Sequence, residues 1–189
     1  MRRFPRSAAV VSAAVVAAGL LGGCATGEEK AAPELPERIC WGAFSGPEVN
    51  RILAPSEKVS HSARPFVLTE EGDHASCQVY ADRATSFMAG VELLASEDEA
   101  EREMWRFPDA LPLDVGTGGS IRPGGAATYV ACDPAASFGR SGTYVALEID
   151  FSIVPDEAKA QDALPGLLKG FLAFTERELR CAGGAAERR

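Results

Sequence analysis

Residues 143–153, with the sequence TYVALEIDFSI, form the clearest pattern in the chain and decide the fold class. Apolar side chains occupy every second position: Val145, Leu147, Ile149, Phe151 and Ile153. Such an alternation predicts a strand with one face in the core and one face in water. We therefore expect Tyr144, Glu148 and Asp150, on the other face, to form an exposed surface that is available to a partner.

The segment after this strand predicts a helix that ends at Gly183-Gly184. Its apolar stripe has helical spacing: Leu164, Leu167, Leu168, Phe171, Leu172, Thr175 and Leu179. Asp156 is placed to cap the start of the helix, and Pro165 is expected to split or kink it. Because the stripe needs an apolar surface to cover, we expect the helix to lie across the apolar face of the strand.

Weaker patterns between these elements and residue 39 predict short strands and short helices. Ser45-Gly46-Pro47-Glu48 and Ser96-Glu97-Asp98-Glu99 have capping-box spacing and predict helices. The expected strands are 59–61, 65–69, 76–82, 86–94 and 128–132. Residues 111–125, rich in Gly and Pro, are expected to be irregular, and residues 133–142 to form a loop. Strands that follow one another without βαβ alternation indicate an α+β fold with an antiparallel sheet, the C-terminal helix packed across one face.

The start of the chain has the features of an export signal. Arginines within residues 2–6 precede an apolar run, 8–21, that is too short for a comfortable membrane span. Leu21-Gly22-Gly23-Cys24 resembles the lipobox of bacterial lipoproteins. That resemblance implies cleavage before Cys24 and attachment of a diacylglycerol to its sulfur. The alternative is an ordinary secretory leader, and the arginine pair leaves general and twin-arginine export both open.

Composition divides the chain into four expected parts. Residues 1–23 are the lipoprotein signal peptide, and residues 24–38, charged and Pro-containing without an apolar period, are a disordered tether. Residues 39–183 form a single α+β domain, and residues 184–189 form a disordered tail. What remains after cleavage has the length of about one domain.

The cysteines after Cys24 are an even set: Cys40, Cys77, Cys132 and Cys181. In an exported domain such a set predicts two disulfides. Of the three possible pairings, chain order favours Cys40–Cys77 and Cys132–Cys181, because each closes a modest loop between neighbouring elements. A metal site is the alternative, but the chain has no Cys-x-x-Cys and its histidines are not spaced as ligands. We expect no metal.

Charge and motifs exclude several functional classes. The formal net charge of −8 argues against a nucleic-acid partner and against a basic patch for anionic lipid, so membrane contact is expected through the lipid on Cys24. A serine hydrolase is not favoured, because Gly139-Arg140-Ser141-Gly142 lacks the last glycine of a nucleophile elbow. The two histidines that could act as its general base, His61 and His74, lie among polar residues. Residues 116–121 fail as a phosphate-binding loop, so no cofactor is expected.

Large aromatic side chains are the remaining candidates for a ligand site. Trp41 and Trp105 are either core residues or the walls of a ligand-binding cleft. Neither alternative is decided by the sequence. The candidate site residues are therefore Cys24 for lipid, the four paired cysteines, and these two tryptophans for a ligand.

The chain as a whole resembles small actinobacterial envelope lipoproteins of unknown function. The resemblance rests on the lipobox, the acidic tether, Ile39-Cys40-Trp41, Cys77-Gln78-Val79, and the long strand before a C-terminal helix. It implies a lipid-anchored domain on the extracytoplasmic face of the cell membrane and supplies no catalytic residue. We expect a non-enzymatic binding or accessory domain of the cell envelope, with an envelope protein or a small molecule as partner. The alternative is a cell-wall-directed hydrolase.

Overall fold

The computed structural model describes residues 34–68, 72–132 and 143–181. Cys24, the leader, the tail, most of the expected tether and the expected loop at 133–142 lie outside these residues. Within the described part, none of the helices combines the length and the apolar character needed to cross a membrane.

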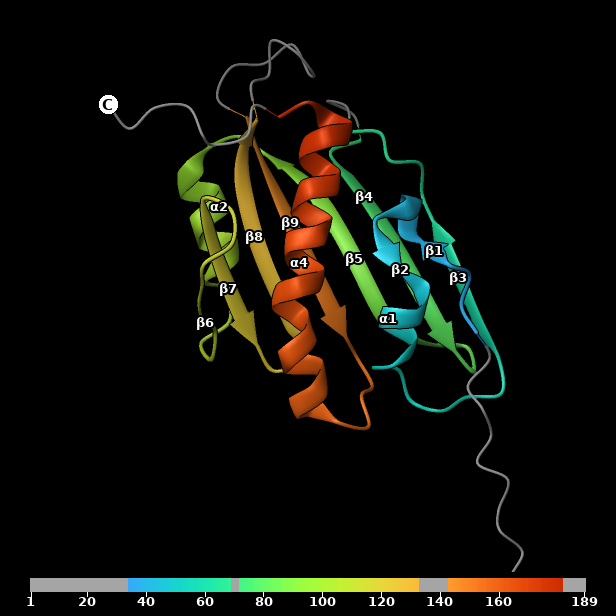
Figure 1. The fold of residues 1–189 in the computed structure, drawn as a ribbon. Coiled ribbons are helices and arrows are strands. Elements are labelled where there is room, and N and C mark those ends of the chain that lie inside the picture. Colours follow the sequence, from blue (N-terminus) through green and yellow to red (C-terminus); the bar gives the residue numbers. More distant parts are fainter. Residues whose placement is uncertain (1–33, 69–71, 133–142, 182–189) are drawn as a thin grey trace, which may run out of the picture.

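The described residues form a seven-stranded antiparallel sheet with the order β3-β4-β5-β9-β8-β7-β6 (Figure 1). The strands are β3 (Val59–Ala63), β4 (His74–Ala81), β5 (Ala84–Leu94), β6 (Leu111–Leu113), β7 (Gly118–Arg122), β8 (Gly125–Cys132) and β9 (Thr143–Phe151). The strand with the clearest alternation, β9, lies at the centre between β5 and β8. The predicted α+β fold is confirmed.

The C-terminal helix, α4 (Glu157–Leu179), crosses one face of the sheet over β8 and β9 (Figure 1). Asp156 caps it as predicted, accepting a hydrogen bond from the backbone N–H of Lys159 at 3.0 Å. The helix runs through Pro165 as one element, contrary to the predicted split, because Leu164 and Leu168 on either side of Pro165 are fully buried against the sheet. Burial of the stripe outweighs the hydrogen bond lost at one proline.

The ends of α4 and β9 differ from the prediction. The helix stops at Leu179, before Gly183, because Arg180 adopts a left-handed conformation with φ of 53°. The strand stops at Phe151, and Ile153, expected on the core face, is 49% exposed. The strand thus ends where its core face becomes exposed, whereas the chain after α4 is still buried at Cys181.

A short N-terminal layer packs beside α4 on the same face (Figure 1). It consists of β1 (Arg38–Ile39), the 3-10 helix η1 (Cys40–Gly42), β2 (Phe44–Ser45) and α1 (Gly46–Asn50). The ring of Phe44 lies 5.0 Å from that of Phe171 in α4. Leu35 is already buried, and the backbone N–H of Gly46 donates to the carbonyl of Glu37 at 2.9 Å. The fold thus includes residues just before 39, where the sequence predicted tether.

Two disulfides fasten these layers within the described chain, with the predicted pairing. Cys40–Cys77 joins η1 to β4, and Cys132–Cys181 joins β8 to the end of α4. Each links a segment that packs on the sheet to a strand of the sheet itself. The prediction of two disulfides with this connectivity is confirmed.

The prediction that residues 111–125 are irregular is wrong, because β6 and β7 lie within them. Gly119 shows why glycines did not prevent pairing: an added Cβ would lie 2.7 Å from the carbonyl oxygen of Leu113 on the neighbouring strand. The absence of a side chain is what lets these backbones approach. Conversely, Pro65 to Leu68 form no strand, although Leu68 is buried in the core.

The sheet face opposite α4 is partly covered by α2 (Glu97–Met104). Ser96 caps this helix as predicted, accepting from the backbone N–H of Glu99 at 3.2 Å. Ala100 and Met104 of α2 pack on Ala127 and Ala146 of the sheet, so part of this face is buried rather than exposed to solvent.

The expectation of an exposed surface at Tyr144, Glu148 and Asp150 is therefore wrong. The side chains of Glu148 and Asp150 are only 25% and 19% exposed and are held in ion pairs, and the hydroxyl of Tyr144 lies 3.4 Å from Glu97 of α2. The alternation of β9 correctly separated two faces, but it could not show that a helix from elsewhere in the chain returns over the second one.

Candidate functional site

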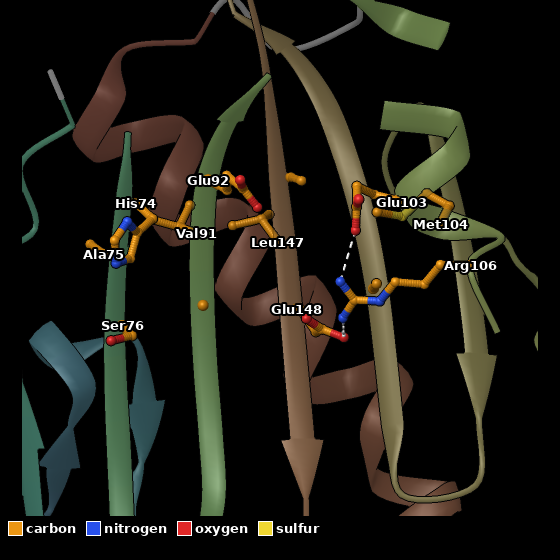
Figure 2. A pocket seen from close by; sticks show the side chains of 13 residues that line it. His74, Ala75, Ser76, Val91, Glu92, Glu103, Met104, Arg106, Leu147 and Glu148 are labelled. Atoms are coloured by element: carbon orange, nitrogen blue, oxygen red, sulfur yellow. Dashed lines mark hydrogen bonds and ion pairs between the residues drawn. The ribbon is translucent and has the colours of Figure 1, made fainter. Parts of the chain in front are cut away.

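A cavity of about 250 Å³ opens on the sheet face opposite α4, between the central strands and the end of α2 (Figure 2). Its lining combines residues of β4, β5, β8 and β9 with Glu103, Met104 and Arg106 from α2 and the turn after it. We call this cavity the groove. None of the cysteines or tryptophans that the sequence singled out is among its lining residues, although Ser76 precedes Cys77 and Met104 and Arg106 flank Trp105.

The floor of the groove is low because its central side chains are small. In the sheet register, Gly90 of β5 lies between Ser76 of β4 and Glu148 of β9. Ala127 and Ala146 continue the floor toward α2. A Cβ built on Gly90 would meet no atom within 4 Å, so the space above this residue is open.

One wall is formed by an arginine that joins α2 to the sheet. Arg106 donates to Glu103 at 2.7 Å and also to Glu148 on β9 (Figure 2). Burial acts to lower the pKa of Arg106, but its bonds to Glu148 and Glu103 outweigh this effect and the pKa is raised. The guanidinium is therefore permanently charged, and its charge is already shared by two carboxylates.

A second arginine, Arg122, donates to the same carboxylate, Glu148, as Arg106 does. Arg122 donates to Glu148 at 2.9 Å and to Asp150, and its Cζ lies 4.0 Å from the ring centre of Phe107. Burial and the neighbouring Glu148 raise the pKa of Asp150, while Arg122 opposes that shift. Because both arginines converge on one carboxylate, the position of Glu148 at the edge of the groove is closely defined.

A further carboxylate in the groove, Glu92, has mostly acidic neighbours. Glu92 pairs across the strands with His74. Burial raises the pKa of Glu92, and the nearby carboxylates of Glu103 and Asp73 raise it further, while His74 acts in the other direction. A raised pKa shows that the ionised form of this carboxylate is disfavoured here.

His74 is held in a way that does not suit a general base. Its Nε2 lies 3.1 Å from the guanidinium of Arg64, which can only donate, and its Nδ1 lies 3.3 Å from Asp73. Because the guanidinium can only donate, Nε2 accepts this hydrogen bond with its lone pair. His61 lies on β3 opposite Val79 and does not line the groove, and Ser141 lies outside the described residues.

The two tryptophans do not line the groove. Trp41 stacks on Phe171 of α4 with ring centres 6.1 Å apart, and its indole N–H donates to the carbonyl of Arg64 at 2.6 Å. Trp105 follows the last residue of α2 and is 49% exposed. Although Trp105 lies between the lining residues Met104 and Arg106 in sequence, neither tryptophan is a lining residue.

The first turn of α2 carries three acidic residues, Glu97, Asp98 and Glu99. Across residues 34–68, 72–132 and 143–181 there is no group of three or more His, Cys, Asp or Glu side chains placed to hold a metal ion. The carboxylates of the first turn of α2 instead face the positive end of the helix dipole.

Comparison with family models, curated proteins and solved structures gave no match. The interpretation of the groove thus rests on its own geometry.

Sequence reasoning missed most of the groove, although two signals were present. Gly90 lies on the face of β5 opposite the buried Ala89 and Val91, and a glycine inside a strand often marks a close approach. Glu92 places an acid on that same strand, two residues further on. Neither signal indicated that Glu103 and Arg106 would lie opposite them, because those residues follow in a separate helix and turn.

The electrostatics of Glu92 lead to a prediction about stability. Since the folded-state pKa of Glu92 is raised, its ionisation destabilises the fold above that pKa, and the cost disappears as the pH falls below the unfolded value of about 4.3. We expect Glu92→Gln to raise the melting temperature at pH 7 and to have a smaller effect at pH 3.5. Asp162→Asn, on the exposed side of α4, removes the same charge and serves as the control. An equal effect of Glu92→Gln at both pH values would contradict the prediction.

Proposed function

We propose that this protein is a membrane-anchored extracytoplasmic lipoprotein that acts as a non-enzymatic binding or accessory domain of the cell envelope. The anchor is the lipid on Cys24, at the outer face of the cytoplasmic membrane. The partner is a small molecule or an envelope protein. Nucleic acid is excluded by the acidic charge of the chain.

The observation that carries this proposal is the use of the cysteines. The sequence has five cysteines: the four that follow Cys24 are paired with one another in two disulfides, and Cys24 is the one that remains. Two disulfides that link separate layers favour an oxidising compartment outside the cytoplasm. The cysteine that takes no part in them is the one that ends the lipobox-like Leu21-Gly22-Gly23-Cys24, where lipid attachment requires a thiol.

The groove supports binding rather than hydrolysis. A hydrolase needs a base with a free lone pair close to the reacting group. The lone pair of His74 accepts a hydrogen bond from Arg64, and Glu148 accepts from Arg106 and Arg122. His74, Glu148 and Arg106 are thus held in place by hydrogen bonds, which suits a preformed binding site.

Lipid attachment can be tested by changing the cysteine of the lipobox. We expect Cys24→Ala to abolish incorporation of a labelled fatty acid and to move the protein from the detergent phase to the aqueous phase, or to leave the leader uncleaved. Ala25→Ser, at the next position, is the matched control and should behave as the wild type. Normal processing and detergent partitioning of Cys24→Ala would refute the proposed anchor.

A further inference from the structure

We propose that the groove binds a small organic cation, an ammonium or guanidinium group on a short aliphatic chain, with the charge at the end lined by Glu92 and Glu103 and the chain over Gly90. This inference deepens the binding role proposed above and names its ligand class. Three independent features of the groove support it: the unfilled space at Gly90, the aliphatic floor and the sign of the charge.

The space at Gly90 is not explained by the needs of the fold. Gly90 is absent from the glycines with positive φ, so its backbone conformation is open to other residues. A Cβ there would meet nothing within 4 Å, so crowding does not require glycine either. Glycine inside a strand weakens a sheet, and it is found where a ligand or another backbone approaches closely. In a central strand of this sheet, the open position above Gly90 is therefore suited to an occupant.

The chemistry of the floor favours an aliphatic occupant. Ala127, Ala146 and Met104 supply apolar surface, and among the described lining residues there is no Phe, Tyr or Trp on which an aromatic ring could stack. The volume of about 250 Å³ lies just below the usual range for drug-sized ligands, which begins at about 300 Å³. A short alkyl chain with one or two polar ends is of the right size.

The charge of the lining determines the sign of the ligand. Glu92, Glu103 and Glu148 face a single lining arginine, Arg106, whose guanidinium already bonds to Glu103 and Glu148. The carboxylate of Glu92, by contrast, has no hydrogen bond or ion pair to the other labelled lining residues (Figure 2).

The charged groups facing Glu92 are mostly acidic. From α2 these are Glu99 and Glu103, and from the β4 side they are Asp73 and His74, of which only His74 acts to lower the pKa of Glu92. Together with burial they raise the pKa of Glu92. A cation placed here would relieve that repulsion, whereas an anion would add to it.

Calorimetric titration of the purified, oxidised full-length protein tests this inference. The probes are agmatine and 1,5-diaminopentane, with 1,5-pentanediol as an uncharged match of the second. We expect saturable binding of the two cations and at least tenfold weaker binding of the diol. Absence of saturable binding up to about 10 mM of both cations, or equal binding of the diol, would overturn the inference.

Two substitutions locate the binding in the groove. Gly90→Val fills the floor and should weaken binding at least tenfold without lowering the melting temperature, because the new side chain enters open space. Glu92→Gln should weaken binding by about tenfold or more while the fold is retained. Asp162→Asn, which removes a charge elsewhere, should bind as the wild type. If Gly90→Val fails to fold, Gly90→Ala and Glu92→Gln decide; unchanged affinity in the folded variants would refute the site.

The outcome is distinguishable from that of the lipid-anchor test. If the protein carries lipid on Cys24 but binds neither cation, the proposed membrane anchor stands and the proposed ligand class is refuted. If the protein binds both cations through Glu92 but carries no lipid, the proposed ligand class stands and the proposed anchor is refuted.

Discussion

Phe171→Ala should lower the free energy of unfolding by about 3–5 kcal/mol. The ring of Phe171 is fully buried near the middle of α4 and stacks on Trp41 at 6.1 Å. It also lies 5.0 Å from the ring of Phe44, so it joins the helix to the N-terminal layer. Because η1 is held to β4 by Cys40–Cys77, the surroundings cannot collapse freely into the space left by the ring. A cavity that persists carries the full cost of the lost contacts.

Chemical denaturation with both disulfides intact measures this effect. Lys169→Ala is the matched control, since it shortens an exposed side chain on the same helix and should change the free energy of unfolding by no more than about 0.5 kcal/mol. Similar losses for the two variants would mean that α4 does not pack on the sheet through Phe171. The position of the C-terminal helix would then be wrong.

Replacing both Cys132 and Cys181 with alanine should destabilise the protein by about 4 kcal/mol. The two cysteines are 49 residues apart in sequence, so their bridge removes considerable freedom from the unfolded chain. In the folded state the bridge holds the last turn of α4 to β8. We expect the loss in chemical denaturation, with the Cys40–Cys77 bridge retained, as checked by mass mapping of the non-reduced protein.

The single variants Cys132→Ala and Cys181→Ala provide the control for this experiment. If the bridge itself stabilises the fold, each single change already removes all of its effect. The free energies of unfolding of the double variant and of each single variant should then agree within about 0.5 kcal/mol. Additive losses would show instead that each sulfur contributes through packing alone. The bridge would then not be the source of the stability.

Where the periodicity was strong, the sequence was sufficient to predict the structure. The alternation in β9 identified Val145, Leu147 and Ile149 as core residues, and the stripe on α4 identified Leu164, Leu168 and Phe171. Hydrophobic burial produces both patterns directly, because a strand or helix that covers a core must repeat its apolar residues with its own geometric period. The disulfide pairing followed in the same way, since each bridge joins elements that are close in chain order.

Where the sequence prediction failed, the cause was a contact with a distant segment. The glycines and prolines in 111–125 predict an irregular segment, but at Gly119 the backbone of a neighbouring strand lies where a side chain would be. Pro165 was expected to interrupt α4, but burial on either side of it holds the helix together. Local propensity cannot include an interaction whose partner is far away in sequence.

The sequence by itself determined the fold class, the two faces of the central strand, the disulfide pairing and the expectation of a lipid anchor at Cys24. Only the tertiary structure decided that α2 returns over the second face of the sheet and that Glu92, Glu103 and Arg106 surround the open position at Gly90. The physical reason is that periodicity reports which side of an element is buried, whereas a binding site depends on which side chains of different elements meet. That meeting is set by the strand order and by the path of the chain between β5 and β6, which no local pattern encodes.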